Sequence, residues 1–402
     1  MVHRGPVKRD GREIMKKIPY GRQHIDSEDI KQVVKTLKSD WLTQGPAVDQ
    51  FEKALAEYCG AKYAVAVSNG TAALHLAMLA AGVAAGDEVV TTPLTFLATA
   101  NSVLYSGARP VFADIEPHTF NADPEEMEKR ITGRTKALAP VHFAGLPCDM
   151  PAISKIARKN RLKVIEDACH ALGSEYRSGG KWIKVGSCRH SDMAVFSFHP
   201  VKHITTGEGG AVTTNSRSLC DRLRRLRAHG VEKTPRMSGE KGAWYYEMTE
   251  LGYNYRLTDI QCSLGISQLK KLGKFVKRRR EIAAMYDRML CGIDGVELPE
   301  AGDKRGHAYH LYVLRVDFRR FDTSRKRFFE KMAEKNIFCQ VHYMPVPEHP
   351  YYRKNVKGCL PKYYPNAMEY YEKAVSIPMF PAMSDADVRR VAGSIRKVLN
   401  VR

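Results

Sequence analysis

The sequence predicts an α/β protein in which a large domain on a mixed, mostly parallel β-sheet precedes a smaller α+β domain. In the first half, short apolar runs alternate with segments of helical periodicity, which is typical of a parallel sheet covered by helices on both faces. The last third has long charged helices and only two strand candidates. A chain of 402 residues is long enough for both domains.

Periodicity and turn residues place the elements of the large domain. The apolar residues between 27 and 38 recur at i, i+3, i+4 and i+7, which predicts an amphipathic helix. Asp123 followed by Pro124 marks another helix start, because Asp caps free amides and Pro is tolerated in a first turn. In chain order we expect helices over 27–38, 47–58, 72–81, 96–106, from 124 onward and over 150–160, and strands over 63–67, 88–92, 110–113, 137–143, 162–166, 193–198 and 210–214.

The later elements define the domain organisation. No long helix separates the expected strands 193–198 and 210–214, so these two strands are expected to pair like a hairpin within the same sheet. No low-complexity linker occurs, so a bridging helix is expected to join two packed domains. The expected helices are 257–290, 324–335 and 385–399, the strands are 311–316 and 338–343, and the domains are a basic extension at 1–17, a large domain at 18–260 and a small domain at 261–402.

The net charge of +20, from 64 Lys and Arg against 44 Asp and Glu, could indicate a polyanionic partner. The basic runs 222–227 and 274–280 lie on predicted helices and are interrupted by apolar residues, which favours solvated helix faces. No window approaches the ~20 apolar residues of a membrane helix. We therefore predict no nucleic-acid and no membrane partner, and rank a basic nucleic-acid-binding or regulatory protein as the lowest alternative.

The cysteines and histidines indicate a compartment and a class of chemistry. The nine cysteines are scattered and form no CxxC, which is typical of free thiols in a reducing compartment. No apolar stretch of the secretory type follows the basic segment at 1–17. The 14 histidines show no HExxH spacing. We predict a cytoplasmic protein without a metal site.

Three polar segments follow predicted strands, at the sheet edge where open parallel sheets bind ligands. Gly70 and Thr71 open a helix whose free amides can bind a phosphate, although an ordinary turn is the simpler interpretation of this segment alone. Asp167 could cap a helix or pair with a buried cation. Lys202 lies in a Gly- and Thr-rich turn, where a desolvated amine can form a Schiff base, although most lysines are solvated.

Together the three segments indicate pyridoxal 5'-phosphate. The helix start would hold the phosphate, Asp167 would keep the pyridine nitrogen protonated, and Lys202 would hold the aldehyde and then move protons. Phe96 could cover the ring face by stacking, or be a core aromatic.

At these residues the sequence resembles the DegT/StrS family of sugar-nucleotide aminotransferases, which are fold-type I pyridoxal phosphate enzymes. The resemblance runs from about Ile18 to about residue 398 and implies an aspartate-aminotransferase-like fold. Six segments match in order, which is a specific signal. They are Leu42–Gly45, Ser68–Leu74, Glu166–His170, Ser197–Lys202 with Gly207–Gly210, Gly252–Arg256 and Gln340–Tyr343.

The resemblance implies a role for each matching residue. The expected catalytic residues are Lys202, Asp167 and His170. The expected cofactor-binding residues are Gly70, Thr71, Phe96, Asp167, Ser197, Lys202 and Asn254. The expected substrate-binding residues are Tyr20, Asp40, Trp41, Leu42, Thr43, Gly70, Ser197, Asn254, Arg256, His342 and Tyr343. Asn254 matches a residue that reaches the phosphate of the neighbouring subunit, so a homodimer with shared active sites is implied; Arg256 could bind the donor carboxylate or form a structural ion pair.

Within the family the chain also resembles the transaminases of pseudaminic acid synthesis. The implied reaction moves the amino group of L-glutamate, through the pyridoxamine form of the cofactor (PMP), to a UDP-linked 4-keto-6-deoxy-N-acetylhexosamine. The products would be 2-oxoglutarate and UDP-4-amino-4,6-dideoxy-N-acetyl-β-L-altrosamine. Family members that dehydrate their substrate carry a His at the position of Lys202, so the lysine favours transamination. The alternative is another nucleotide-linked keto-sugar, of the perosamine or 4-amino-arabinose type.

Overall fold

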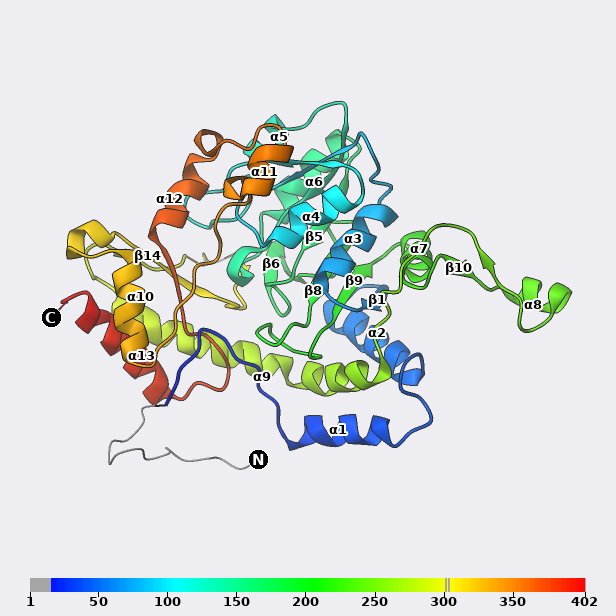
Figure 1. Ribbon diagram of the computed structural model, residues 1–402, viewed down its shortest axis with the longest axis horizontal. Helices are drawn as coiled ribbons and strands as arrows, with labels where there is room; N and C mark the ends of the chain where they lie inside the picture. The colour runs from blue at the N-terminus through cyan, green and yellow to red at the C-terminus, as the bar shows by residue number, and fades with distance from the viewer. Residues whose placement is uncertain (1–15, 301, 303, 402) are drawn as a thin grey trace.

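The computed structural model describes residues 16–300, 302 and 304–401, so the basic extension predicted at 1–17 lies outside it except for Lys16 and Lys17. A seven-stranded sheet has the order β1-β9-β8-β5-β4-β2-β3. Figure 1 labels β1, β9, β8 and β5 of this sheet. β9 runs antiparallel to both neighbours, and the other strand pairs are parallel. The mixed, mostly parallel sheet is confirmed, including its paired last strands. Its strands are β1 Tyr63–Val67, β2 Glu88–Thr91, β3 Arg109–Phe112, β4 Thr135–Ala139, β5 Lys163–Asp167, β8 Met193–Ser197 and β9 Gly210–Thr214.

Helices begin where capping residues occur. The side chain of Asp123 accepts hydrogen bonds from amides in the first turn of α5, and Pro124 is the first residue of that helix. Helix α3 begins at Gly70, two residues earlier than expected, because the side chain of Asn69 caps it. The helices in this half of the chain are α1 Ser27–Leu37, α2 Pro46–Cys59, α3 Gly70–Ala80, α4 Leu97–Tyr105, α5 Pro124–Lys129, α6 Met150–Lys159 and α7 Arg217–Arg227.

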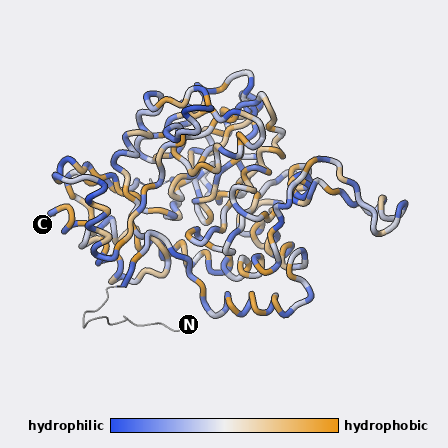
Figure 2. The backbone as a smooth tube through the Cα atoms, viewed as in Figure 1, coloured by the Kyte–Doolittle hydropathy of each residue, from blue (hydrophilic) through white to orange (hydrophobic). Residues whose placement is uncertain are grey.

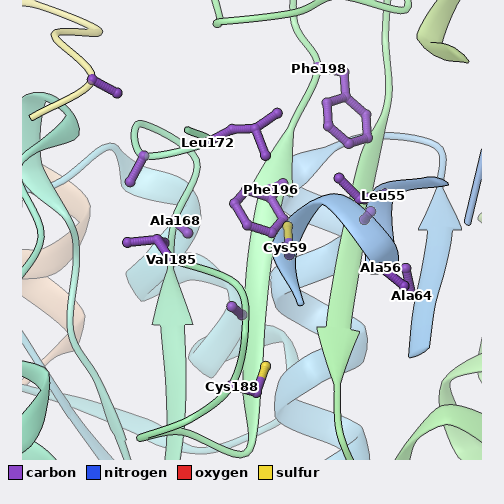
Figure 3. Packing of buried hydrophobic residues seen from close by; sticks show 14 of the residues in the cluster. Leu55, Ala56, Cys59, Ala64, Ala168, Leu172, Val185, Cys188, Phe196 and Phe198 are labelled. Atoms are coloured by element: carbon purple, nitrogen blue, oxygen red, sulfur yellow. The ribbon is translucent and has the colours of Figure 1, made fainter. Parts of the chain in front are cut away.

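One core cluster fixes the end of β8, where the predicted cofactor segment begins (Figure 3). Phe196 and Phe198 are fully buried with Leu55 and Cys59 of α2. At Gly186 the backbone has φ 92°, and a Cβ would lie 2.5 Å from the ring of Phe196, so this close approach requires glycine. Burial of both aromatic rings therefore holds the strand end in place.

Helix α9 Asp259–Leu290 connects the two cores, as expected of the bridging helix near 257–290. Its first half, up to Val276, is buried with the large sheet, whereas Ile282 to Leu290 pack in a second core with α13 Asp385–Val398. The apolar stripe of α13 is buried in that core, as predicted. The domain boundary at 260 itself stays a prediction.

The second core carries a three-stranded antiparallel sheet and corrects one predicted strand. The sheet is formed by β12 Val296–Glu297, β14 Tyr312–Val316 and β15 Ala374–Ile377, and α10 Arg325–Glu334 packs on α13. The strand expected over 338–343 is wrong. Only Gln340 pairs with Ser376 at the sheet edge, and beyond this pair the segment lines a cavity instead of continuing in the sheet.

An arm projects from the molecule at the right of Figure 1, and the sequence analysis did not predict it. It contains β10 Val231–Glu232, α8 Pro235–Lys241 and β11 Glu247–Met248. Figure 2 shows the arm standing clear of the rest of the chain. Trp244 and Leu251 are 79% and 75% exposed there. The remaining elements are β6 Glu175–Ser178, β7 Lys181–Lys184, β13 Arg305–Gly306, α11 Pro350–Asn355 and α12 Pro365–Lys373, with short 3₁₀ turns at Phe143–Gly145, Phe318–Phe321, Val346–Glu348 and Pro361–Tyr363.

Two further observations apply to the part of the chain that the structure describes. No helix there is long and apolar enough to cross a membrane. No three His, Cys, Asp or Glu side chains there are grouped so that they could hold a metal ion. All nine cysteines lie in the described part, and each is free.

Candidate active site

A cavity of about 920 Å³ opens at the carboxyl ends of β5 and β8. Its wall comes from the start of α3, the turn before α4, the loop between β8 and β9, and the segment 340–343. This is the sheet edge at which the sequence placed the ligand. The predicted site residues that line the cavity are Tyr20, Gly70, Thr71, Phe96, Asp167, His170, Ser197, Lys202, His342 and Tyr343.

The start of α3 gives the cavity an anion-binding wall. The first bond inside the helix runs from the amide of Ala73 to the carbonyl of Asn69, so the amides of Gly70 and Thr71 precede the helical pattern. Together with the helix dipole they favour a negative group. A Cβ at Gly70 would lie 2.8 Å from the Cβ of Ser197, so glycine keeps this recess open. The recess fits a cofactor phosphate.

Asp167 ends β5 and is buried at the cavity wall. Its Oδ1 accepts a hydrogen bond from the amide of Cys169 at 3.1 Å, and its Oδ2 accepts one from the hydroxyl of Thr99 at 2.6 Å. These bonds fix the plane of the carboxylate at the cavity wall, where it could pair with a protonated pyridine nitrogen. The sequence analysis missed Thr99; the signal was a second threonine four residues after Thr95, at the start of the helix that follows β2.

Lys202 lies in the loop between β8 and β9, with its amide bonded to the carbonyl of His199 at 2.9 Å. Burial lowers the pKa of the Lys202 amine below its usual value, while the neighbouring Cys169 and Asp167 oppose the shift. A lowered pKa increases the neutral fraction of the amine, and only the neutral form is a nucleophile or a base.

His170 lies at the cavity wall among buried rings. Its Nε2 is 3.1 Å from the hydroxyl of Tyr343, and its ring centroid is 4.3 Å from that of His310. Burial, together with the charge of Lys202, holds the pKa of His170 well below its usual value, so the ring is neutral near neutral pH. His310 also lines the cavity, and the sequence analysis did not single it out.

His342 and Tyr20 form another part of the wall, with ring centroids 5.3 Å apart. The Nδ1 of His342 is 2.8 Å from the hydroxyl of Ser376, and the hydroxyl of Tyr370 donates to the His342 carbonyl at 2.7 Å. Burial lowers the pKa of His342 to about 3, so this ring is also neutral. These bonds hold the irregular segment against the cavity.

The other predicted substrate residues do not line the cavity of their own chain. Trp41 is 58% exposed, and the backbone of the exposed Asn254 pairs with Ala228. Their predicted contacts, which the resemblance assigns partly to a neighbouring subunit, stay predictions. This set consists of Asp40, Trp41, Leu42, Thr43, Asn254 and Arg256.

Residues 23–396 match the model of the DegT/DnrJ/EryC1/StrS aminotransferase family. The chain belongs to this family. It is 44% identical to the spore coat polysaccharide biosynthesis protein SpsC of Bacillus subtilis, over 95% of this chain and 97% of SpsC. It is 40% identical to a UDP-4-amino-4,6-dideoxy-N-acetyl-beta-L-altrosamine transaminase of Campylobacter jejuni, over 95% and 97%. It is 35% identical to a UDP-4-amino-4-deoxy-L-arabinose–oxoglutarate aminotransferase of Shewanella sediminis, over 95% and 98%.

Solved structures of family members have the same architecture. Helicobacter pylori PseC, an aminotransferase of pseudaminic acid biosynthesis, has a TM-score of 0.87 and 34% identity over 96% of this chain and 100% of PseC. Spr1654 of Streptococcus pneumoniae in its PLP form has a TM-score of 0.87 and 29% identity over 96% and 99%. The aspartate-aminotransferase-like fold is confirmed, and this DegT/DnrJ/EryC1/StrS protein is a sugar aminotransferase that uses pyridoxal 5'-phosphate.

Proposed function

We propose that the protein transfers the amino group of L-glutamate to a UDP-linked 4-keto-6-deoxy-N-acetylhexosamine, giving UDP-4-amino-4,6-dideoxy-N-acetyl-β-L-altrosamine. The observation that carries the proposal is the buried amine of Lys202 in one cavity with Asp167 and the free amides of α3. Similarity to the Campylobacter transaminase over nearly the full length of both chains supports this sugar. The free thiols support a reducing compartment, and we place the reaction in the cytoplasm.

The chain's own residues would orient the cofactor. When bound, pyridoxal phosphate supplies an electron sink for the carbon atom that exchanges a proton. The amides of Gly70 and Thr71 and the hydroxyl of Ser197 would hold its phosphate, and Asp167 would face its pyridine nitrogen, since all four residues line one cavity. Lys202 would supply the amine that binds the cofactor covalently in the resting enzyme.

Lys202 also has the properties of the proton carrier. Because burial lowers its pKa, a larger neutral fraction is present near neutral pH, where a base must accept a proton. In the first half-reaction its amine would move a proton from the α-carbon of glutamate to the cofactor carbon that receives the amino group, and in the second it would move a proton from that carbon to C4 of the sugar. The buried ring of His170 and the partly buried ring of Tyr343 line the cavity wall and are 3.1 Å apart at the His170 Nε2 and the Tyr343 hydroxyl.

We also propose a homodimer with shared active sites. Phe96 and Tyr105, at the cavity, and Trp244, on the arm, are large apolar side chains with most of their surface exposed. Exposed apolar side chains in this number favour a covered interface. Asn254 is exposed and does not line the cavity of its own chain, so it is available for the contact with the cofactor phosphate of a second copy that the family resemblance implies.

A panel of acceptors tests the proposed reaction. Purified protein with cofactor and L-glutamate is incubated with UDP-linked 4-keto-6-deoxy-N-acetylhexosamines of both C5 configurations, a UDP-linked 4-keto-pentose and dTDP-linked keto-sugars. We expect the highest kcat/KM with the hexosamine that gives the altrosamine product, identified by NMR. A higher value with the pentose or a dTDP-sugar would overturn the choice of substrate while leaving the aminotransferase activity intact.

A second acceptor has support from one relative. The Shewanella protein is named for transfer to an arabinose derivative, and its match covers as much of this chain as that of the Campylobacter enzyme. The sequence identity of this chain to the Campylobacter enzyme is 40%, against 35% to the Shewanella protein, which favours the altrosamine reaction. The UDP-linked 4-keto-pentose in the panel decides between them.

A further inference from the structure

Two threonine hydroxyls form a chain from the cavity wall to Asp167. Thr99 Oγ1 lies 2.6 Å from Asp167 Oδ2, and Thr95 Oγ1 lies 2.7 Å from Thr99 Oγ1. Thr95 and Thr99 are 2% and 0% exposed, so bulk water does not compete for these bonds. Thr95 lies in the turn before α4 and Thr99 in the first turn of that helix, so one helix start holds both hydroxyls.

The charge of the carboxylate determines the direction of the chain. An ionised carboxylate only accepts hydrogen bonds, so the hydroxyl of Thr99 donates its single proton to Asp167. The oxygen of Thr99 is then free to accept from the hydroxyl of Thr95, 2.7 Å away. The amide of Cys169 donates to the other carboxylate oxygen at 3.1 Å. Asp167 thus accepts one bond on each oxygen, which fixes the plane of its carboxylate.

We propose that Thr99, supported by Thr95, is a positioning residue that holds the carboxylate of Asp167 in one orientation with a hydrogen bond to its Oδ2, so that the shared proton stays on the pyridine nitrogen of the cofactor. This inference rests on the proposed placement of that nitrogen against Asp167. Without the Thr99 bond the carboxylate becomes a stronger proton acceptor, and the proton moves toward it. The ring then carries less positive charge and is a weaker electron sink.

The direct test is Thr99→Val, which removes the hydroxyl with little change in volume. The absorbance of the holoenzyme is titrated with pH to find the midpoint at which the lysine-bound cofactor gains or loses its proton. We expect the midpoint to rise by about one pH unit, because a less positive ring holds that proton more tightly. We expect kcat to fall by about tenfold, with little change in the KM for the sugar nucleotide.

Three further variants make the test specific to the hydroxyl chain. Thr99→Ser restores a donor and should return both values toward those of the wild type. Thr95→Val should shift the midpoint in the same direction by a smaller amount. Ser102→Ala is the matched control: it removes another buried hydroxyl of α4, which donates to the helix carbonyl of Thr99 at 2.8 Å and not to the site. It should leave the midpoint unchanged.

Other outcomes separate this inference from the proposed function. A wild-type midpoint in Thr99→Val, or an equal shift in Ser102→Ala, would overturn the role of the hydroxyl chain. If Thr99→Val does not accumulate as holoenzyme, an unshifted midpoint in Thr95→Val would overturn it. Lys202→Ala tests the placement of the cofactor separately: if that variant keeps the absorbance band of the covalently bound cofactor, the proposed site itself is wrong.

Discussion

At the scale of single residues, Lys202 carries a buried amine whose environment favours the neutral form. In the unfolded chain a lysine amine has a pKa of about 10.4, and burial lowers the pKa of Lys202 in the folded protein. Between the two values the unfolded chain binds more protons than the folded chain. The free energy of unfolding therefore rises with pH across this window, and a charged Lys202 destabilises the folded state below it.

We therefore expect Lys202→Met to stabilise the cofactor-free protein at pH 7, by about 1 kcal/mol. The gain should shrink as the pH rises from the folded-state pKa of Lys202 toward the unfolded value of about 10.4, and vanish above that value, because only there is the amine of the wild type neutral in both states. Urea unfolding at a series of pH values measures this difference. Lys155→Met, at an exposed lysine on α6, is the control and should show no such dependence. A gain that grows with pH would contradict the sign derived for Lys202.

Gly70 leaves the recess between α3 and β8 open for the cofactor phosphate. In Gly70→Ala the new Cβ would lie 2.8 Å from the Cβ of Ser197, so the recess is filled. We expect the dissociation constant of pyridoxal phosphate to rise by about tenfold or more, measured by fluorescence titration. Gly273→Ala, on α9, places its Cβ in open space and should bind the cofactor like the wild type. An unchanged dissociation constant of pyridoxal phosphate in Gly70→Ala would contradict the placement of the cofactor phosphate in this recess.

At the scale of elements, α9 is fastened by a buried arginine. Arg279 is fully buried, and its Nη1 donates to the carbonyls of Tyr309, His310 and Met379 at 3.0, 3.2 and 2.9 Å. These bonds tie the helix to the loop behind the cavity and to the segment after β15.

We expect Arg279→Ala to lower the free energy of unfolding by about 3 kcal/mol, because it leaves a cavity and three carbonyls without this donor. Its neighbour provides the comparison. Arg278 bonds Glu281 and Asp385 near the surface, so Arg278→Ala should cost about 1 kcal/mol or less. Chemical denaturation of both variants gives the two values. Equal decreases in the free energy of unfolding of the two variants would show that the buried hydrogen bonds of Arg279 add no stability beyond that of a surface arginine.

Local sequence patterns predicted some elements of the fold correctly and misassigned one segment. The α13 stripe and the start of α5 were predicted because periodicity and capping are local properties of the chain. The segment 338–343 was misassigned because its apolar and polar residues alternate like a strand, whereas its surroundings direct those side chains into the cavity. Lys202 and Asp167 were predicted from the chemistry of a known cofactor, while Thr99 and His310 were missed because only the fold brings them to that cofactor's residues.

At the scale of the whole molecule, part of the excess positive charge is paired with carboxylates of the same chain. The run at 222–227 does not form a free cationic face, because its arginines pair with two carboxylates. Arg224 and Arg227 bond the buried Glu52, and Arg222 and Arg225 bond Glu250. The nucleic-acid alternative therefore loses one of the two basic runs that suggested it.

The proposed shared site predicts complementation between two inactive variants. Lys202→Ala removes the amine of a site, and Asn254→Ala removes the residue that we place in the neighbouring site. In an equal mixture that exchanges subunits, half of the dimers combine the two variants and have one intact site, so about a quarter of the wild-type activity should return. Each variant alone gives the baseline. No recovery after verified subunit exchange would place Asn254 in its own chain's site.

The central claim is that Lys202 carries the amino transfer, and the glutamate half-reaction tests it most directly. Holoenzyme is mixed with L-glutamate in the absence of any sugar nucleotide, and the 2-oxoglutarate released is measured per active site. The wild type should release one equivalent as its absorbance band shifts, and Lys202→Ala, loaded with the same cofactor, should release almost none on that timescale. Release of a full equivalent by Lys202→Ala at the wild-type rate would contradict the account.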